Sequence, residues 1–199
     1  MMNKFMNVPN VLSLVRIILS PVFIYLFLTG DIAYQRLSLL VFFIAVLTDW
    51  YDGWYARKYK NITKTGVFLD PFADKILTTT AFALFYIKNI MPLWMFVIIA
   101  FRDIVITIVR SYDEYNGLTL RTSKIAKTKT FIQMTYIFML LILLIYPTYD
   151  TKGITIDNIT NFLNSDINYV LMFFVTAITL YTGISYFFEK GYYKKNEID

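Results

Sequence analysis

Four aspartates lie within a short stretch of an otherwise apolar chain: Asp49, Asp52, Asp70 and Asp74. At about 100° per residue, the first two fall on one face of a helix, and the other two, four residues apart, share one face of a second helix. The link between these helices is short, which makes them antiparallel neighbours whose acidic faces can meet. Each charged side chain at the centre of a membrane helix costs on the order of 3 kcal/mol, so these carboxylates require compensation.

Bound divalent cations are the compensation that the sequence favours. Arg57 and Lys75 are nearby cations, but two cations do not neutralise four anions. The chain contains no histidine and no cysteine, which excludes imidazole bases, thiolate nucleophiles, disulfides and metal sites with nitrogen or sulfur ligands. Mg²⁺ and Mn²⁺ prefer oxygen ligands, and carboxylates on facing helices can hold two such ions for phosphoryl chemistry. We therefore expect two Mg²⁺ or Mn²⁺ ions at the four aspartates.

Small residues accompany the acids on the same helical faces. Gly53, Ala56 and Arg57 follow the first aspartate pair, and Gly66 precedes the second pair by one turn. Such residues let a nucleotide approach the backbone, although small residues also serve close helix packing. Beside four carboxylates, the nucleotide-binding interpretation is favoured.

The elements that must position these residues are membrane helices. Of the 199 residues, 57% are hydrophobic, and the mean hydropathy is +0.54. Stretches long enough to cross a bilayer occur at residues 10–29, 36–58, 67–88, 92–112, 125–147 and 168–189. The sequence therefore predicts an all-α membrane protein with six transmembrane helices, forming one domain over residues 1–199, with a polar surface loop at about 147–167.

The distribution of basic residues predicts the orientation. One side of the membrane would hold Lys4, Lys58, Lys60, Lys64, Arg121, Lys124, Lys127, Lys129, Lys190, Lys194 and Lys195, and the other Arg36, Lys88 and Lys152. By the positive-inside rule the first side is cytoplasmic, and with six spans both termini lie there. The net charge is +5, and most of the basic residues lie on one side of the membrane. We therefore attribute this charge to membrane topology and to contact with anionic lipid, and expect no nucleic acid partner.

The aspartate stretch matches a family signature, D-x2-D-G-x2-A-R-x8-G-x3-D-x3-D. On these residues the chain resembles the CDP-alcohol phosphatidyltransferase family. The resemblance implies a six-helix membrane enzyme, usually a homodimer, that transfers a phosphatidyl group from a CDP-lipid to an alcohol and releases CMP. It implies that all four aspartates bind metal and that Asp74 is also the base toward the acceptor hydroxyl. It further implies contacts to the CDP moiety from Asp49, Asp52, Gly53, Ala56, Arg57 and Gly66.

Outside the signature, the chain is similar to the bacterial phosphatidylglycerophosphate synthase branch. We expect an integral protein of a bacterial inner membrane with its active site facing the cytoplasm, because the aspartates lie at the basic ends of their helices. The similarity lies in residues 7–16 and 123–133. It implies CDP-diacylglycerol and sn-glycerol 3-phosphate as substrates, with Arg102, Arg110 and Lys127 binding the acceptor phosphate. Anchoring at the membrane interface is an alternative role for such cations, and it suits Lys124 and Lys129 better than Arg102.

Two departures from this branch leave the acceptor open. Ala126 replaces a usual glycine, and Phe101-Arg102-Asp103 stands where Ser-Arg-Glu is common. Inositol phosphate, phosphatidylglycerol and serine therefore remain alternative acceptors, although the cations disfavour serine. An ion-coupled transporter is an alternative of another class, because membrane carboxylates also bind transported cations. The acids lie near one membrane surface beside small residues, an arrangement that favours the enzyme.

Overall fold

A computed structural model of the chain describes residues 8–59, 66–116, 118–120, 124–149, 153–188 and 192–194. The long helices are α1 (Val8–Leu28), α2 (Ile32–Tyr59), α3 (Gly66–Ile87), α4 (Leu93–Tyr115), α5 (Lys124–Ile145) and α7 (Asp166–Phe188). The shorter elements are β1 (Leu118–Leu120), a 3-10 turn at Tyr146–Thr148, α6 (Gly153–Leu163) and β2 (Tyr192–Lys194).

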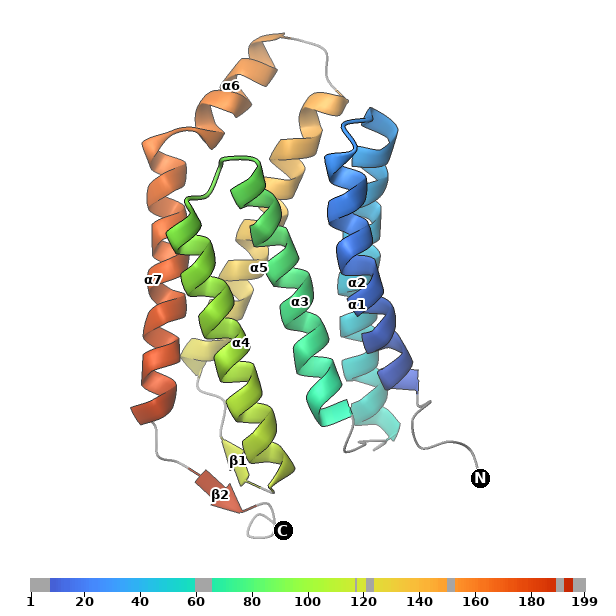
Figure 1. Cartoon of the computed structure of the whole chain (residues 1–199), viewed down its shortest axis with the longest axis vertical. Coiled ribbons are helices and arrows are strands. Elements are labelled where there is room, and N and C mark those ends of the chain that lie inside the picture. Colours follow the sequence, from blue (N-terminus) through green and yellow to red (C-terminus); the bar gives the residue numbers. More distant parts are fainter. Residues whose placement is uncertain are drawn as a thin grey trace.

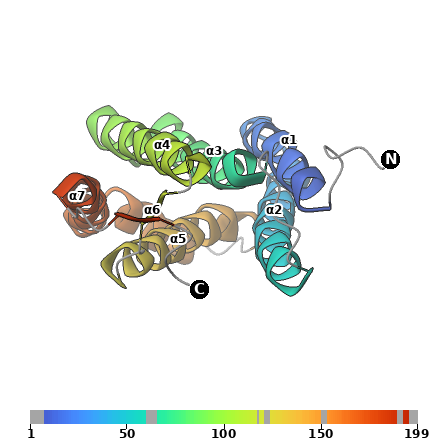
Figure 2. The same cartoon turned by 90° about the horizontal axis from the view of Figure 1, so that it is seen from below.

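The six long helices form a closed ring (Figures 1 and 2). Around it, α1 packs against α2 and α3, α3 against α4, α4 against α7, α7 against α5, and α5 against α2. The start of α1, the end of α2, the start of α3 and the end of α7 all lie at the lower end in Figure 1. At that end β1 and β2 pair antiparallel, with Leu118 opposite Lys194. The two aspartate pairs are therefore delivered to one end of the bundle.

Tight turns at the upper end of the bundle make neighbouring helices antiparallel. Between α1 and α2, Gly30 takes a φ of 80°, a conformation that glycine adopts without a steric penalty. Asp31 then caps α2, because its Oδ1 accepts a hydrogen bond from the backbone N–H of Ala33 at 2.7 Å. Between α3 and α4, Asn89 has a φ of 57°, and Pro92 precedes the first residue of α4.

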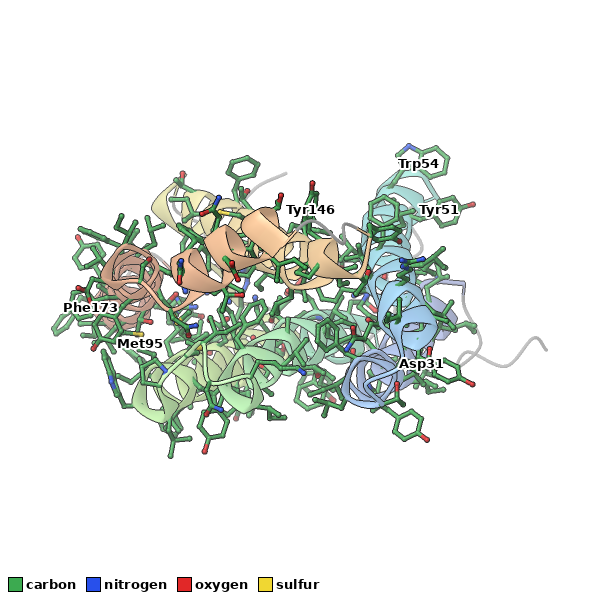
Figure 3. All side chains as sticks on the ribbon, turned by 90° about the horizontal axis from the view of Figure 1, so that it is seen from above. Asp31, Tyr51, Trp54, Met95, Tyr146 and Phe173 are labelled. Carbon is green, nitrogen blue, oxygen red and sulfur yellow. The ribbon has the colours of Figure 1, made fainter. Side chains whose placement is uncertain are left out.

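Apolar side chains fill the inside of the ring and also cover its outside. Phe23 and Phe42 are fully buried and their ring centroids lie 5.0 Å apart. Figure 3 places Met95 on the inner side where α4 and α7 meet, whereas Trp54 and Phe173 point away from the ring. Large apolar side chains on an outer surface are typical of contact with lipid. Together with the long apolar helices, they identify the chain as an integral membrane protein.

Among the described residues, four helical segments satisfy the length and composition of a membrane span: Pro9–Leu28, Ile32–Asp49, Thr128–Thr148 and Asp166–Phe188. The helices α3 and α4 lie where the other two spans are predicted, but they carry more ionisable residues. The helical membrane architecture is confirmed, with β1 and β2 as a short addition at one end, and the count of six spans stays a prediction.

The surface loop predicted at about 147–167 is wrong in part, because it contains the 3-10 turn and α6. Within α6 the apolar residues recur at helical spacing. Ile156, Ile159 and Phe162 are partly covered, while Asp157 and Asn158 are exposed. The Asn/Asp-rich composition suggested a loop, but the amphipathic period of 3.6 residues determined the local structure.

A buried hydrogen bond between α5 and α7 provides a test of the packing. The hydroxyl of Tyr136 donates to Oδ1 of Asn168 at 2.8 Å, and these residues are 6% and 1% exposed. Tyr136→Phe removes this donor, and we expect it to lower the free energy of unfolding by about 1 kcal/mol. Thermal unfolding in detergent measures the change. Tyr181→Phe is the matched control, because Tyr181 is 61% exposed. Equal effects of the two substitutions would contradict a role for the Tyr136 hydrogen bond.

Candidate active site

Arg16 on α1 holds the first pair of aspartates. Its Nη2 donates to Oδ2 of Asp52 at 2.5 Å, and its Nη1 lies 2.8 Å from Oδ1 of Asp49, outside hydrogen-bond alignment. The Arg16 side chain is fully buried, whereas the Asp49 side chain is 44% exposed. The buried guanidinium of Arg16 and the buried carboxylate of Asp52 are tolerated here because each compensates the charge of the other.

The second pair of aspartates is held by different groups. The hydroxyl of Ser13, also on α1, donates to Oδ1 of Asp70 at 2.5 Å. Lys75 Nζ lies 3.1 Å from Oδ2 of Asp74. Because α1 packs against both α2 and α3, one turn of α1 reaches both acidic faces.

The two acidic faces converge on this turn of α1. Arg16 contacts Asp49 and Asp52 of α2, and Ser13, three residues earlier, contacts Asp70 of α3. We call Asp49, Asp52, Asp70 and Asp74 the acid cluster.

The donors of the acid cluster fit a divalent cation in their chemistry. Among the described residues, one oxygen of each carboxylate contacts Arg16, Ser13 or Lys75, and the other oxygen has no hydrogen-bond or ion-pair partner. These remaining oxygens are hard ligands of the kind that Mg²⁺ and Mn²⁺ prefer. In the described arrangement, however, no group of three acidic side chains is placed to hold a metal ion. Arg16 and Lys75 supply the positive charge instead.

The predicted nucleotide-binding residues are only partly described. Gly66 is buried at the first position of α3, one turn before Asp70. Gly53, Ala56 and Arg57 belong to α2, but their side chains and surroundings lie outside the described residues. Their contacts to a CDP moiety stay a prediction.

A second charged group surrounds Asp103 on α4, whose side chain is 1% exposed. Lys129 Nζ donates to both carboxylate oxygens, at 2.8 and 3.1 Å. Nη1 of Arg102 donates to Oδ1 at 2.8 Å, and Lys75 Nζ lies 4.0 Å from Oδ2. Gln133 donates to Oδ2 at 3.3 Å. We call Lys75, Arg102 and Lys129 the cation cluster. Its three positive charges surround a single carboxylate.

The helix α7 fixes the position of Arg102. The Nη2 of Arg102 donates to Oγ1 of Thr182 at 2.8 Å. A Cβ atom on Gly183 would lie 2.7 Å from Cγ of Arg102, so only glycine leaves room for this side chain. The guanidinium therefore spans from α7 to Asp103.

The predicted acceptor-phosphate residues have different outcomes. Arg102 lies in the cation cluster, whereas Arg110 is exposed two turns further along α4, and no described residue pairs with it. The side chain of Lys127 lies outside the described residues. The interfacial role suggested for Lys129 is wrong, because Lys129 is 3% exposed and binds Asp103.

Sequence reasoning missed three residues that organise the site: Arg16, Asp103 and Lys129. A signal existed for each, since each is a charged residue inside an otherwise apolar helix. Their partners are on other helices, however, and helical periodicity within one segment gives no information on which helices pack together.

Comparisons with known proteins agree on one family. The profile of the CDP-alcohol phosphatidyltransferase family matches residues 6–184. A protein of Rickettsia typhi (strain ATCC VR-144 / Wilmington) is 31% identical over 182 residues, covering 91% of this chain and 95% of the relative. A protein of Bacillus subtilis (strain 168) is 34% identical over 148 residues, and one of Wigglesworthia glossinidia brevipalpis is 38% identical over 141 residues; both alignments cover 68% of this chain and 77% of the relative. All three are named CDP-diacylglycerol--glycerol-3-phosphate 3-phosphatidyltransferase.

The burial of Arg16 provides a test of the acid cluster. Arg16→Met leaves Asp49 and Asp52 without their cation, and we expect a loss of about 3 kcal/mol or more in the free energy of unfolding. Added Mg²⁺ or Mn²⁺ should raise the melting temperature of this variant more than that of the unsubstituted protein, because more carboxylate charge is uncompensated. Arg110→Met is the matched control, since Arg110 is exposed. An equal metal response in all three proteins would contradict a shared role of Arg16 and metal at these carboxylates.

Proposed function

Because the chain belongs to the CDP-alcohol phosphatidyltransferase family, we propose that it transfers a phosphatidyl group from CDP-diacylglycerol to sn-glycerol 3-phosphate. The products are phosphatidylglycerophosphate and CMP. One observation carries the proposal: Lys75 contacts both Asp74 of the acid cluster and Asp103 within the cation cluster. The acid cluster and the cation cluster therefore lie side by side, which supports a metal-bound pyrophosphate at the first and an anionic acceptor at the second.

The acid cluster is proposed to hold the CDP-lipid through divalent metal. The four carboxylates would be its ligands, and the bound metal would neutralise charge that builds on the pyrophosphate and on the departing CMP. The metal is proposed to be Mg²⁺ or Mn²⁺, with two ions bound. Gly53, Ala56, Arg57 and Gly66 are proposed to contact the CDP moiety beside them.

Asp74 is proposed as the base. The acceptor hydroxyl attacks the phosphorus that carries diacylglycerol, forming a new P–O bond while the P–O bond to CMP breaks. The hydroxyl proton passes to the Asp74 carboxylate, and CMP leaves with the bonding electrons. The chain has no histidine or cysteine that could act as the base. A carboxylate is therefore the proposed proton acceptor.

The cation cluster is proposed to bind the acceptor phosphate. Arg102 and Lys129 are buried or nearly so, and the three cations of the cluster outnumber the two carboxylates that they contact, Asp103 and Asp74. Excess positive charge inside an apolar bundle favours an anion, and guanidinium and ammonium groups are phosphate donors. This favours glycerol 3-phosphate over serine, which carries no phosphate. Arg110 and Lys127 remain proposed contributors.

The proposal extends to topology. The helices α3 and α4 would cross the membrane with the four apolar helices, giving six spans within a single domain over residues 1–199. The end of the bundle that carries the acid cluster would face the cytoplasm, with both termini on that side, in a bacterial inner membrane. The protein is proposed to form a homodimer.

The proposed reaction is tested by release of CMP. Purified protein with CDP-diacylglycerol, Mg²⁺ or Mn²⁺ and sn-glycerol 3-phosphate should release CMP, and chelation of the metal should abolish the release. Asp74→Asn should lower the rate by at least about 100-fold, as expected for loss of a positioned base. Asp157→Asn is the control, because Asp157 is exposed on α6. Activity only with inositol phosphate, phosphatidylglycerol or serine would refute the acceptor, and no activity with any of them would refute the transferase.

The cation cluster makes a separate prediction. Arg102→Met and Lys129→Met should each raise the KM for glycerol 3-phosphate by about tenfold or more, because each removes a charged donor to the phosphate. The KM for CDP-diacylglycerol should change little. Arg110→Met, on the exposed face of α4, should have a smaller effect. A larger effect at Arg110 than at Lys129 would place the phosphate outside the cation cluster.

A further inference from the structure

Asp103 has no part in the chemistry proposed above, yet it is the centre of the most connected polar group in the described chain. Its side chain is 1% exposed, and it accepts hydrogen bonds from residues of its own helix and of α5. A buried carboxylate inside a membrane bundle is costly, so its retention requires strong compensation or a function. Compensation alone would need one cation, whereas Arg102 and Lys129 both lie 2.8 Å from Asp103, and Lys75, shared with Asp74, lies 4.0 Å away.

The contacts of Asp103 fix each cation in a defined direction. Lys129 bonds both carboxylate oxygens, which restrains a long side chain that otherwise has many rotamers. Arg102 is restrained at both ends of its guanidinium, by Asp103 and by Thr182. Its Nε is buried and has no hydrogen-bond partner among the described residues.

Lys75 links this group to the base. Its Nζ lies 3.1 Å from Asp74 Oδ2 and 4.0 Å from Asp103 Oδ2, so the two carboxylates share one ammonium. Without Asp103, three like charges would repel one another and Lys75 would have Asp74 as its remaining acidic contact. The cations would then spread apart, and the acceptor site would no longer be preorganised beside the base.

From these contacts we propose that Asp103 is a positioning residue that holds Lys75, Arg102 and Lys129 as a preorganised site for the acceptor phosphate, at a fixed place relative to Asp74. This inference rests on the proposed function. In this proposal Asp103 fixes the directions of the three cations. Its single negative charge does not cancel theirs, so the cluster stays positive and can attract an anion.

The experiment measures both substrates in Asp103 variants of the full-length protein. Asp103→Asn keeps the shape and removes the charge, and the KM for glycerol 3-phosphate should rise by at least about tenfold. The KM for CDP-diacylglycerol should stay within about twofold, since its contacts lie in the acid cluster. Asp103→Glu keeps the charge and should restore most of the affinity for glycerol 3-phosphate. Thr107→Val is the control, because Thr107 is 7% exposed one turn away on α4.

A double variant separates positioning from neutralisation and keeps the test usable if Asp103→Asn alone does not fold. Asp103→Asn combined with Lys129→Met removes one negative and one positive charge, so the excess charge of the cluster is unchanged. If Asp103 positions the cations, the double variant should have a higher KM for glycerol 3-phosphate than Lys129→Met alone. Equal KM values would overturn the proposal, as would a loss in kcat without a change in KM or an equal effect of Thr107→Val.

Binding of inorganic phosphate gives a readout that does not depend on the transferase reaction. Millimolar phosphate should raise the melting temperature of the unsubstituted protein and of Asp103→Glu, but not that of Asp103→Asn or of the double variant. If the unsubstituted protein releases no CMP with glycerol 3-phosphate, the proposed acceptor fails while this measurement still decides on Asp103. Equal stabilisation of all variants by phosphate, or of none including the unsubstituted protein, would overturn the positioning role.

Discussion

Ionised side chains among apolar helices must be compensated, and this constraint organises the whole bundle. Nearly every buried charge in the described chain has a partner on another helix. Arg16 of α1 compensates Asp52 of α2, and Lys129 of α5 compensates Asp103 of α4. Such pairs are strong only when the helices meet in one arrangement, so the charges that serve the site also restrict how the helices can pack. The apolar contacts of the ring are less selective, because lipid offers them an equivalent environment.

The helix α1 illustrates this dependence. It carries none of the acids, yet Ser13 and Arg16 lie one turn apart and contact the acidic faces of both α2 and α3. The ring arrangement allows this, because α1 packs against both helices (Figure 2). Arg16 supplies positive charge to Asp49 and Asp52 and so offsets part of the repulsion between carboxylates where α2 and α3 approach α1.

Much of the fold followed from the sequence, because hydrophobic stretches and helical spacing are local properties. The six long helices lie where the apolar stretches were found, and the acidic faces of α2 and α3 both contact one turn of α1. What could not be predicted depends on packing between distant segments. Lys129 resembled an interfacial lysine until Asp103, far from it in sequence, proved to be its partner. The space that Gly183 leaves for Arg102 is likewise a property of two helices that meet only in the folded chain.

The signs of the two clusters give the site a division of labour. The acid cluster is negative and offers carboxylate oxygens that have no partner among the described residues, so it would repel a phosphate unless a cation lay between. The cation cluster is positive and would repel divalent metal, so the proposed metal and the proposed acceptor phosphate would each be disfavoured in the place of the other. Lys75 stands at the boundary, with one carboxylate from each side in contact with its ammonium. Because Lys75 contacts one carboxylate of each region, a change of charge at either carboxylate alters the electrostatic energy of the same ammonium group.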